Sequence, residues 1–349
     1  MPSNRLRVVT VAIAGFGSVG RQVARTLLAR RARYAQVYGC EVRLVAVCAS
    51  RGGVAARAGL EGIDTLALEE DRTGPTFLAE LAPDVLFETG PTDFATGGPA
   101  LGYLTAQLAE GRDAVVVSKG ALVHSGHALR ALARETGAAL RISGATAAAL
   151  PTIDLVETGL RGARVLSLEG VFNATTNFLL NAMMARGCTF AEALGEAQAG
   201  GFAERDPSRD IEGWDTACKL TILANFGLDL GLALEDVAVS GVGDVTPAMV
   251  AQWRAQGQVP RLVGRLDCTG ARARASVSVQ TYPLDDAFAH IPGKTKALRV
   301  VTDCMGEILT MGGGPEPIAT ASAALKDFEL ILDARGRSGQ GASGNFFLG

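Results

Sequence analysis

Short apolar runs alternate with longer amphipathic segments over the first 145 residues. Runs at 8–14, 42–49, 84–88 and 114–117 are rich in β-branched residues and have the length of buried strands. Segments 21–30, 98–110 and 130–136 follow a helical period instead, and 139–142 forms a further short strand. This alternation predicts an α/β fold in which a Rossmann-type domain carries a mostly parallel sheet.

The pattern changes in the second half of the chain. Helices are predicted at 152–160, 178–185, 190–199, 213–225 and 249–256, with loop at 200–212. Strands are predicted at 165–171, 262–268, 275–281, 298–302 and 308–311, and the last two pair as a hairpin. Residues 145–311 therefore form a second domain of the α+β class. A helix at 319–332 returns to the first domain, which comprises 1–144 and 312–334, and the Gly- and Ser-rich segment 335–349 is a flexible tail.

Composition narrows the class of protein. A chain of 349 residues with 48% hydrophobic and 20% charged residues suits two globular domains. A net charge of −3 gives no electrostatic reason to expect nucleic acid as a partner, and no segment has the length and apolarity of a membrane span. Six scattered cysteines without a CxxC pair are typical of reduced thiols in the cytoplasm.

A glycine-rich motif follows the first predicted strand. The order is strand 8–14, then GFGSVG, then a helix, which is the context that a dinucleotide-binding motif requires. Gly15 allows a tight turn, Gly17 lets the backbone approach a pyrophosphate, and Gly20 lets the helix pack closely. The alternative is a glycine turn without a ligand. The predicted contacts are Gly15, Phe16, Gly17, Ser18, Val19 and Gly20.

The ends of the other strands carry further candidate residues. Ser50 and Arg51 follow the strand 42–49, where a protein specific for NAD usually has an acid and an arginine accommodates the 2′-phosphate of NADP. NADP is therefore favoured over NAD, unless Arg51 is only a solvent-facing loop residue. Thr89 and Gly90 end one strand and Lys119 ends another, so all three are expected to face the cofactor.

Carboxylates are concentrated in the segment 200–219. An acidic loop leads into a helix on which Asp215 and Lys219 lie four residues apart on one face. Such carboxylates suit the ammonium group of an amino acid, and the lysine suits its carboxylate or a reacting oxygen. The alternative is a solvated acidic loop followed by an ordinary helical ion pair. The charged residues concerned are Glu204, Asp206, Asp210, Glu212, Asp215 and Lys219.

With these residues assembled, the chain resembles the homoserine dehydrogenases almost from end to end. The motifs that carry the resemblance are GFGSVG at 15–20, VVVSKGAL at 115–122, ATAAALPTID at 145–154, GVFNATTNFLL at 170–180, GGFAERDPSRDIEGWDTACKLTILAN at 200–225 and TDCMGEILTMGGGPEPIATASA at 302–323. The resemblance implies NAD(P)-dependent interconversion of L-homoserine and L-aspartate 4-semialdehyde, in the biosynthesis of threonine, methionine and isoleucine. It also implies that residues 145–311 are the catalytic and dimerisation domain of a cytoplasmic homodimer or higher homo-oligomer. The chain length leaves no room for the regulatory domain of longer members.

The resemblance also implies roles for individual residues. Lys219 matches the catalytic acid/base, and Lys119 matches a second lysine of the active site. We expect Lys119 to polarise the reacting oxygen; the alternative is that it contacts a cofactor phosphate or lies on the surface. Asp215 acts on the pKa of Lys219 in the opposite sense to Lys119, and the sequence does not decide which effect wins. Gly313 matches the segment that returns to the nucleotide. The residues implied to bind the substrate are Thr175, Glu204, Asp210 and Asp215.

A monovalent cation such as Na⁺ is a further implication of the resemblance. Its ligands are the backbone carbonyls of Thr146, Ala148 and Leu150, but the family often carries glutamate where Ser143 stands, so this chain lacks one expected ligand. Ala174 likewise replaces a common glycine in the family's N-G-T-T-N motif. Two other functions stay open: a different NADP-dependent amino-acid or semialdehyde dehydrogenase, and a nicotinamide-binding sensor without turnover.

Overall fold

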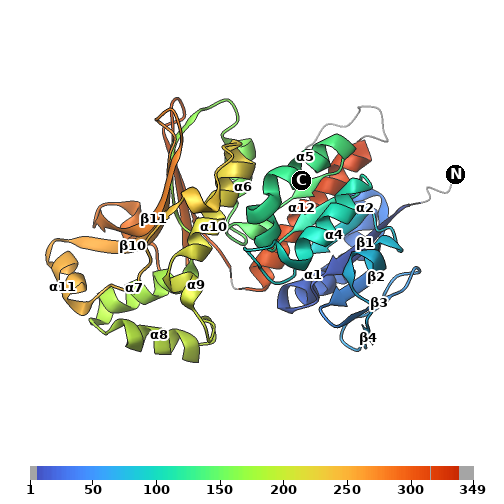
Figure 1. Cartoon of the computed structure of the whole chain (residues 1–349), viewed down its shortest axis with the longest axis horizontal. Coiled ribbons are helices and arrows are strands. Elements are labelled where there is room, and N and C mark those ends of the chain that lie inside the picture. The colour runs from blue at the N-terminus through green and yellow to red at the C-terminus, as the bar shows by residue number, and fades with distance from the viewer. Residues whose placement is uncertain (1–5, 315, 338–349) are drawn as a thin grey trace. The chain divides into compact units, whose positions relative to one another are not determined.

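The computed structural model describes residues 6–314 and 316–337, which form two compact units (Figure 1). The first unit contains residues 6–145 together with 316–337, and the second contains residues 146–314. In the described ranges, no helix is long and apolar enough to cross a membrane.

A seven-stranded sheet forms the centre of the first unit, in the order β4-β3-β2-β1-β5-β6-β7. Strands β2, β1, β5, β6 and β7 run parallel, whereas β3 pairs antiparallel with β2 and β4 pairs antiparallel with β3 at one edge. The loops after β1 and β5 leave in opposite directions along the sheet, which is where doubly wound folds bind nucleotides. The predicted Rossmann-type sheet is thus confirmed. The strands are β1 (Arg7–Ala14), β2 (Cys40–Ala49), β3 (Gly52–Ala55), β4 (Glu69–Glu70), β5 (Val85–Glu88), β6 (Asp113–Val116) and β7 (Leu140–Arg141).

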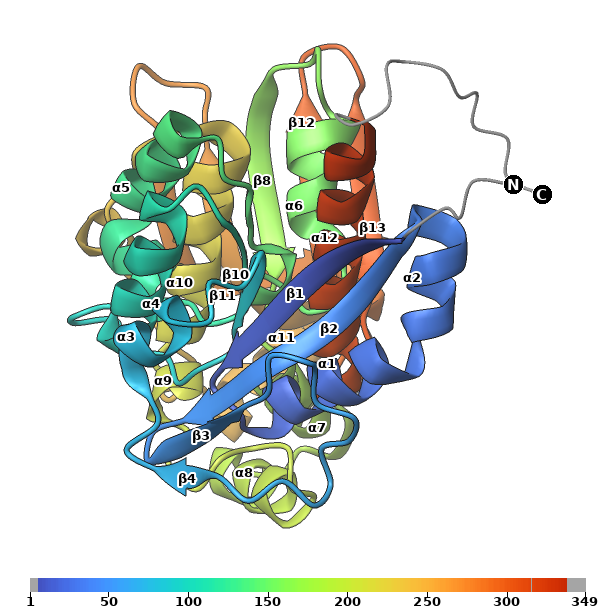
Figure 2. The ribbon, with the colours of Figure 1, turned by 90° about the vertical axis from the view of Figure 1, so that its right-hand side faces the viewer.

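Helices cover both faces of this sheet (Figure 2). On one side are α1 (Ser18–Ala29), α2 (Arg31–Tyr38) and α12 (Ile318–Arg337), and on the other are α3 (Gly74–Ala79), α4 (Gly98–Ala109) and α5 (Gly120–Thr136). The ring of Phe328 on α12 lies 5.6 Å from the rings of both Tyr34 and Phe87, centroid to centroid. The predicted return of the last helix to the first unit is therefore confirmed.

The second unit contains a six-stranded sheet in the order β13-β12-β8-β10-β11-β9, antiparallel except for the pair of β11 and β9. Its mixture of sheet and helices agrees with the predicted α+β class. The strands are β8 (Val165–Val171), β9 (Ala238–Val239), β10 (Gln258–Asp267), β11 (Arg274–Pro283), β12 (Lys296–Thr302) and β13 (Glu307–Gly312). The main helices are α7 (Ala174–Arg186), α8 (Phe190–Ala199), α10 (Trp214–Ile222) and α11 (Pro247–Ala255), with shorter turns at α6 (Thr152–Asp154), η2 (Leu155–Gly159), α9 (Ser208–Ile211) and η3 (Leu223–Gly227).

Several predicted boundaries differ from the structure. Helix α7 begins four residues before 178, because the side chain of Asn173 caps it. The predicted loop 200–212 contains α9, which is too short to show a hydrophobic period. Helix α5 contains the predicted helical segment 130–136, and it extends back to Gly120 although the backbone of Ser125 interrupts it. Helix α12 continues to Arg337, so the first residues of the predicted tail are helical, and residues 338–349 lie outside the described part.

Candidate functional site

The glycine motif after β1 forms a turn against the turn after β5. Gly15 has a φ of +94°, and a Cβ there would lie 2.3 Å from the amide nitrogen of Gly90. The hydroxyl of Thr89 donates to the Gly15 carbonyl at 2.6 Å. A Cβ at Gly20 would lie 2.2 Å from that same carbonyl oxygen. Packing within the protein therefore requires glycine at both positions.

Gly17 differs from these two glycines. A Cβ there would meet no protein atom within 4 Å, so protein packing does not explain the glycine. Gly17 is the N-cap of α1, and no side chain caps the amides of the first turn. These amides and the helix dipole suit a phosphate, and the small residue lets the ligand approach the backbone. The residues present therefore fit a dinucleotide. The sequence did not indicate that Arg21 stacks on Phe16, 4.5 Å from the ring centroid.

The turn of Ser50 and Arg51 connects β2 to β3, and both residues are exposed. The structure adds acids that the sequence did not connect with this turn. Strand β4 places Glu70 opposite Gly52 and Glu69 opposite Gly53, one and two residues after Arg51. The carboxylate of Glu69 forms an ion pair with Arg72 at 2.9 Å. A basic and an acidic group thus both lie near the end of β2.

A buried carboxylate links the ends of β5 and β6. Glu88 is 1% exposed, and it accepts hydrogen bonds from the Ser118 hydroxyl at 2.5 Å and the Gly90 amide at 2.8 Å. Burial raises the pKa of Glu88 to about 6. Lys119 follows Ser118 at the N-cap of α5, and its amide donates to the Thr92 hydroxyl at 3.4 Å. The predicted residues Thr89, Gly90 and Lys119 therefore lie at neighbouring strand ends.

The second unit carries a separate cluster of ionisable side chains. Lys219 Nζ lies 2.6 Å from Asp215 Oδ2, one turn earlier on α10, and donates to the Phe172 carbonyl at 3.0 Å. The lysine and aspartate side chains are only 12% and 14% exposed. Such a half-buried pair interacts more strongly than the solvated helical pair that the sequence left open.

Asn173 connects this pair to two more predicted residues. Its amide nitrogen donates to Asp210 Oδ1 at 2.7 Å and to Asp215 Oδ2 at 2.9 Å. Burial, and then the charge of Asp215, raise the pKa of Asp210, while hydrogen bonds from Asn173 and Thr175 and the charge of Lys219 oppose that rise. The structure thus brings Thr175, Asp210, Asp215 and Lys219 together.

Glu204 stands apart from this cluster in the structure. It is exposed in the segment before α9, and its carboxylate makes no hydrogen bond or ion pair with another described residue. Its backbone carbonyl accepts a hydrogen bond from the Gln198 amide. Lys119 belongs to the first unit, and Gly313 lies near the end of the second with a φ of +126°.

The predicted cation loop follows the end of the first unit. Ala148 has a left-handed backbone with a φ of +55°, and the Leu150 carbonyl accepts a hydrogen bond from the Thr152 amide at 2.7 Å. The hydroxyls of Thr146 and Thr152 also lie 2.7 Å apart.

The side chain of Ser143 has another role in the structure. Its hydroxyl donates to Asp327 Oδ1 at 2.7 Å and accepts from Lys326 at 2.6 Å, both on α12. Position 143 therefore anchors α12 and supplies no carboxylate to the neighbouring loop. Among residues 6–314 and 316–337, no group of three or more His, Cys, Asp or Glu side chains could hold a metal ion.

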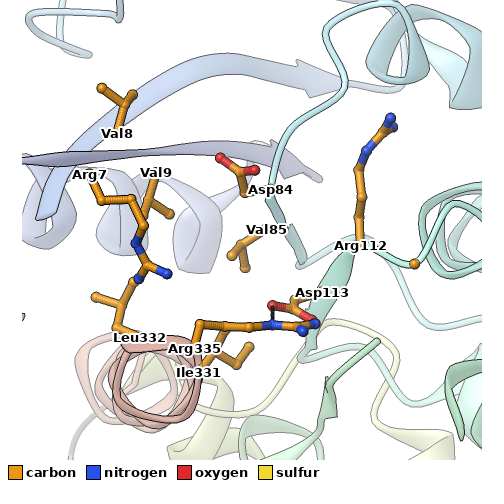
Figure 3. Close-up of a pocket in the computed structure, with 11 residues that line it drawn as sticks. Arg7, Val8, Val9, Asp84, Val85, Arg112, Asp113, Ile331, Leu332 and Arg335 are labelled. Carbon is orange, nitrogen blue, oxygen red and sulfur yellow. Dashed lines mark hydrogen bonds and ion pairs between the residues drawn. The ribbon is translucent and has the colours of Figure 1, made fainter. Parts of the chain in front are cut away.

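A cavity of about 190 Å³ lies at the amino ends of the strands of the first sheet, opposite the strand ends that carry Thr89, Gly90 and Lys119 (Figure 3). The amino ends of β1, β5 and β6 line it together with α12, and the ion pair of Arg335 and Asp113, at 2.5 Å, closes one side. Ligands of doubly wound sheets bind at the carboxyl ends of the strands, so this cavity is not the nucleotide site.

Comparison with known proteins agrees with this geometry. Residues 151–328 match the family model of homoserine dehydrogenase, and residues 15–143 match the model of the homoserine dehydrogenase NAD binding domain. The homoserine dehydrogenase of Methanocaldococcus jannaschii is 30% identical over 93% of this chain and 98% of its own. The NAD(+)-dependent homoserine dehydrogenase of Pseudomonas canavaninivorans is 30% identical over 91% and 94%. The crystal structure of a homoserine dehydrogenase from Thiobacillus denitrificans has a TM-score of 0.83 and 26% identity, and covers 95% of this chain and 74% of its own.

Proposed function

Because this chain belongs to the homoserine dehydrogenase family of nicotinamide-dependent oxidoreductases acting on a CH–OH group, we propose that Lys219 moves the hydroxyl proton of homoserine. The observation that carries this proposal is the half-buried Lys219, held by Asp215 and by the Phe172 carbonyl. A lysine fixed by two oxygen acceptors has a defined direction in which it can exchange a proton with a bound substrate.

The reaction requires a hydride transfer and a proton transfer. A bound nicotinamide would supply the hydride donor for reduction and the hydride acceptor for oxidation. Lys219 as an ammonium donates a proton to the aldehyde oxygen during reduction, and the neutral amine accepts it back during oxidation. Lys119, the N-cap of α5, is proposed to polarise the same oxygen.

The substrate is proposed to bind through its ammonium group. Asp210, half-buried beside the Thr175 hydroxyl, supplies one anionic partner, and Glu204 supplies a second from the preceding loop. The exposed position of Glu204 leaves its carboxylate available to a ligand. Because ammonium and carboxylate are oppositely charged, protonation of Asp210 should weaken substrate binding.

Nicotinamide reduction by the purified protein tests the reaction directly. Addition of L-homoserine should produce absorbance of the reduced cofactor, and Lys219→Ala should lower kcat about 1,000-fold. The cofactor dissociation constant should change less than twofold in that variant. Near-normal turnover by Lys219→Ala would exclude the lysine as the acid/base. Cofactor binding without turnover of homoserine or any other amino alcohol would favour a sensor, and turnover of a different substrate would favour another dehydrogenase.

For the cofactor we propose NADP, with NAD as a second candidate. The absence of an acid at the end of β2 and the exposed Arg51 support a 2′-phosphate. Glu69 and Glu70 on β4 support NAD, because carboxylates near the turn repel a phosphate, and the Pseudomonas canavaninivorans relative is NAD(+)-dependent. The ratio of kcat/KM for the two cofactors decides between them.

A cation at the carbonyls of Thr146, Ala148 and Leu150 stays a prediction. The left-handed backbone of Ala148 supports an unusual carbonyl arrangement, whereas Ser143 contributes no carboxylate. We place no catalytic step at this loop. Equal rates in NaCl, KCl and choline chloride at one ionic strength are expected if no cation takes part.

The cellular setting is also part of the proposal. We propose a cytoplasmic enzyme of threonine, methionine and isoleucine biosynthesis, which its family and its six free cysteines support. We further propose a homodimer or higher homo-oligomer that uses the sheet of the second unit, where Leu309 and Met311 on β13 expose apolar side chains. Light scattering of the purified protein measures the assembly.

A further inference from the structure

Asn173 occupies the turn between β8 and α7 and is 5% exposed. Its Oδ1 accepts a hydrogen bond from the Thr176 amide at 2.9 Å, which caps α7. Its Nδ2 donates at 2.7 Å to Asp210 and at 2.9 Å to Asp215. One side chain thus joins α7, α9 and α10, which Figure 1 shows together in the second unit.

The contacts themselves settle the orientation of this amide. A flipped amide would direct Oδ1 at two carboxylates and Nδ2 at a backbone N–H, so these three contacts would become repulsive. The preceding residue contributes to the same arrangement, since the Phe172 carbonyl accepts from Lys219. The turn of Phe172 and Asn173 therefore contacts both acids and the lysine.

We propose that Asn173 is a positioning residue that holds Asp210 and Asp215 side by side in their ionised forms and so keeps Lys219 paired with Asp215. This inference rests on the proposed function of the site. Asn173 has no contact with the reacting atoms in this assignment and acts through the three ionisable residues.

The electrostatics of the pair show why an amide is needed there. The charged groups that act on Asp210 are Asp215, which favours its protonation, and Lys219, which opposes it. Burial also raises the pKa of Asp210, and the Asn173 hydrogen bond lowers it. Without the amide hydrogens, Asp210 should retain a proton and donate it to Asp215, in competition with Lys219.

Two variants separate the positioning role from the helix cap. Asn173→Ser keeps an N-cap acceptor but loses the two amide hydrogens. Asn173→Asp also keeps the cap and the shape, but adds a third carboxylate to the cluster. Thr246→Ala is the matched control, because the Thr246 hydroxyl caps α11 through the Met249 amide and has no role in the cluster.

The decisive measurement is a carbon-13 NMR titration of the aspartate carboxyls in the free enzyme. Asn173→Ser should raise the apparent pKa of Asp210, because the carboxylate loses the hydrogen bond that favours its ionised form, and Asn173→Asp should raise it further. At pH 7, kcat/KM for homoserine should fall about 10- to 100-fold, and the acidic limb of its pH profile should move up with the titration. Thr246→Ala should lower the melting temperature and leave the titration unchanged.

An unchanged titration and pH profile in Asn173→Ser would show that the residue only caps α7 and would overturn the inference. If Asn173→Ser does not fold, the same comparison with Asn173→Thr, which also keeps a cap acceptor and lacks the amide hydrogens, decides the question. The titration uses no substrate, so it stays informative even if the wild type does not oxidise homoserine. In that case the proposed function fails while the titration still decides the role of Asn173.

Discussion

The candidate sites of the two units consist of different chemical groups. The first unit uses backbone: a glycine turn, the free amides of α1 and a neighbouring turn pressed against it. The second unit uses side chains, and a buried asparagine joins two aspartates and a lysine. Sites made of backbone should therefore be sensitive to shape, whereas sites made of ionisable groups should be sensitive to charge and pH.

Gly15→Ala should give the largest loss of stability in the first unit. The new Cβ would lie 2.3 Å from the Gly90 amide, in a left-handed conformation that alanine disfavours. We expect the free energy of unfolding to fall by about 3 kcal/mol or more, measured by urea denaturation. Gly17→Ala is the control: it should unfold like the wild type but bind the cofactor about tenfold more weakly. Equal stability of both variants and the wild type would contradict a site made by close backbone packing.

Glu88→Gln should give the second-largest change in the free energy of unfolding. Glu88 is an ionisable side chain buried in the first unit, whose candidate site otherwise consists of backbone groups. Its folded pKa of about 6 exceeds the ordinary 4.5, so the native state binds the proton more tightly. The stability from that proton is present below pH 4.5 and is lost as the pH rises through 6. Glutamine cannot ionise, and the Ser118 hydroxyl can rotate to accept from its amide. Above pH 6 the variant should therefore be more stable than the wild type, by about 2 kcal/mol.

Urea denaturation between pH 4.5 and 8 measures this difference. Glu80→Gln, at an exposed position of the same unit, should follow the wild type throughout the range. A constant difference between Glu88→Gln and the wild type across this range would mean that the carboxyl does not titrate as described.

Arg51→Ala should give the smallest of these effects. The loss of one charge-assisted contact should raise the KM for NADP about tenfold and leave the KM for NAD unchanged. Arg57→Ala is the control, since the exposed Arg57 donates to the Glu80 carbonyl and its loss should change neither KM. An equal change in KM for both cofactors would show that Arg51 does not recognise the 2′-phosphate, and NAD would then be the favoured cofactor.

Hydrophobic periodicity predicted the elements that carry long apolar runs. Strand β8 has the predicted bounds, and β1 and β2 differ from their predictions by two residues or fewer. The glycine motif predicted its own turn because all of its residues are consecutive. Local sequence contains the information for such features, since the strand, the turn and the helix follow one another directly.

The features that periodicity missed depend on distant partners. Asn173 contacts acids 37 and 42 residues away, and no local pattern distinguishes it from an ordinary helix cap. Glu88 ends an apolar strand, but its partner Ser118 lies 30 residues further on. The family resemblance supplied Asp210, Asp215 and Lys219, yet not the amide that joins them. Packing of separate segments creates these contacts, so the structure was needed to find them.

The position of α12 also has a consequence for the order in which the protein folds during synthesis. The core of the nucleotide unit includes Ala321, Leu325 and Phe328, which the ribosome adds after the whole of residues 146–314. Tyr34 and Phe87 are synthesised early, but their ring contacts with Phe328 can form only after Phe328 has been synthesised. The second unit can thus complete its fold while the first still lacks a helix, and the N-terminal unit of this chain finishes last.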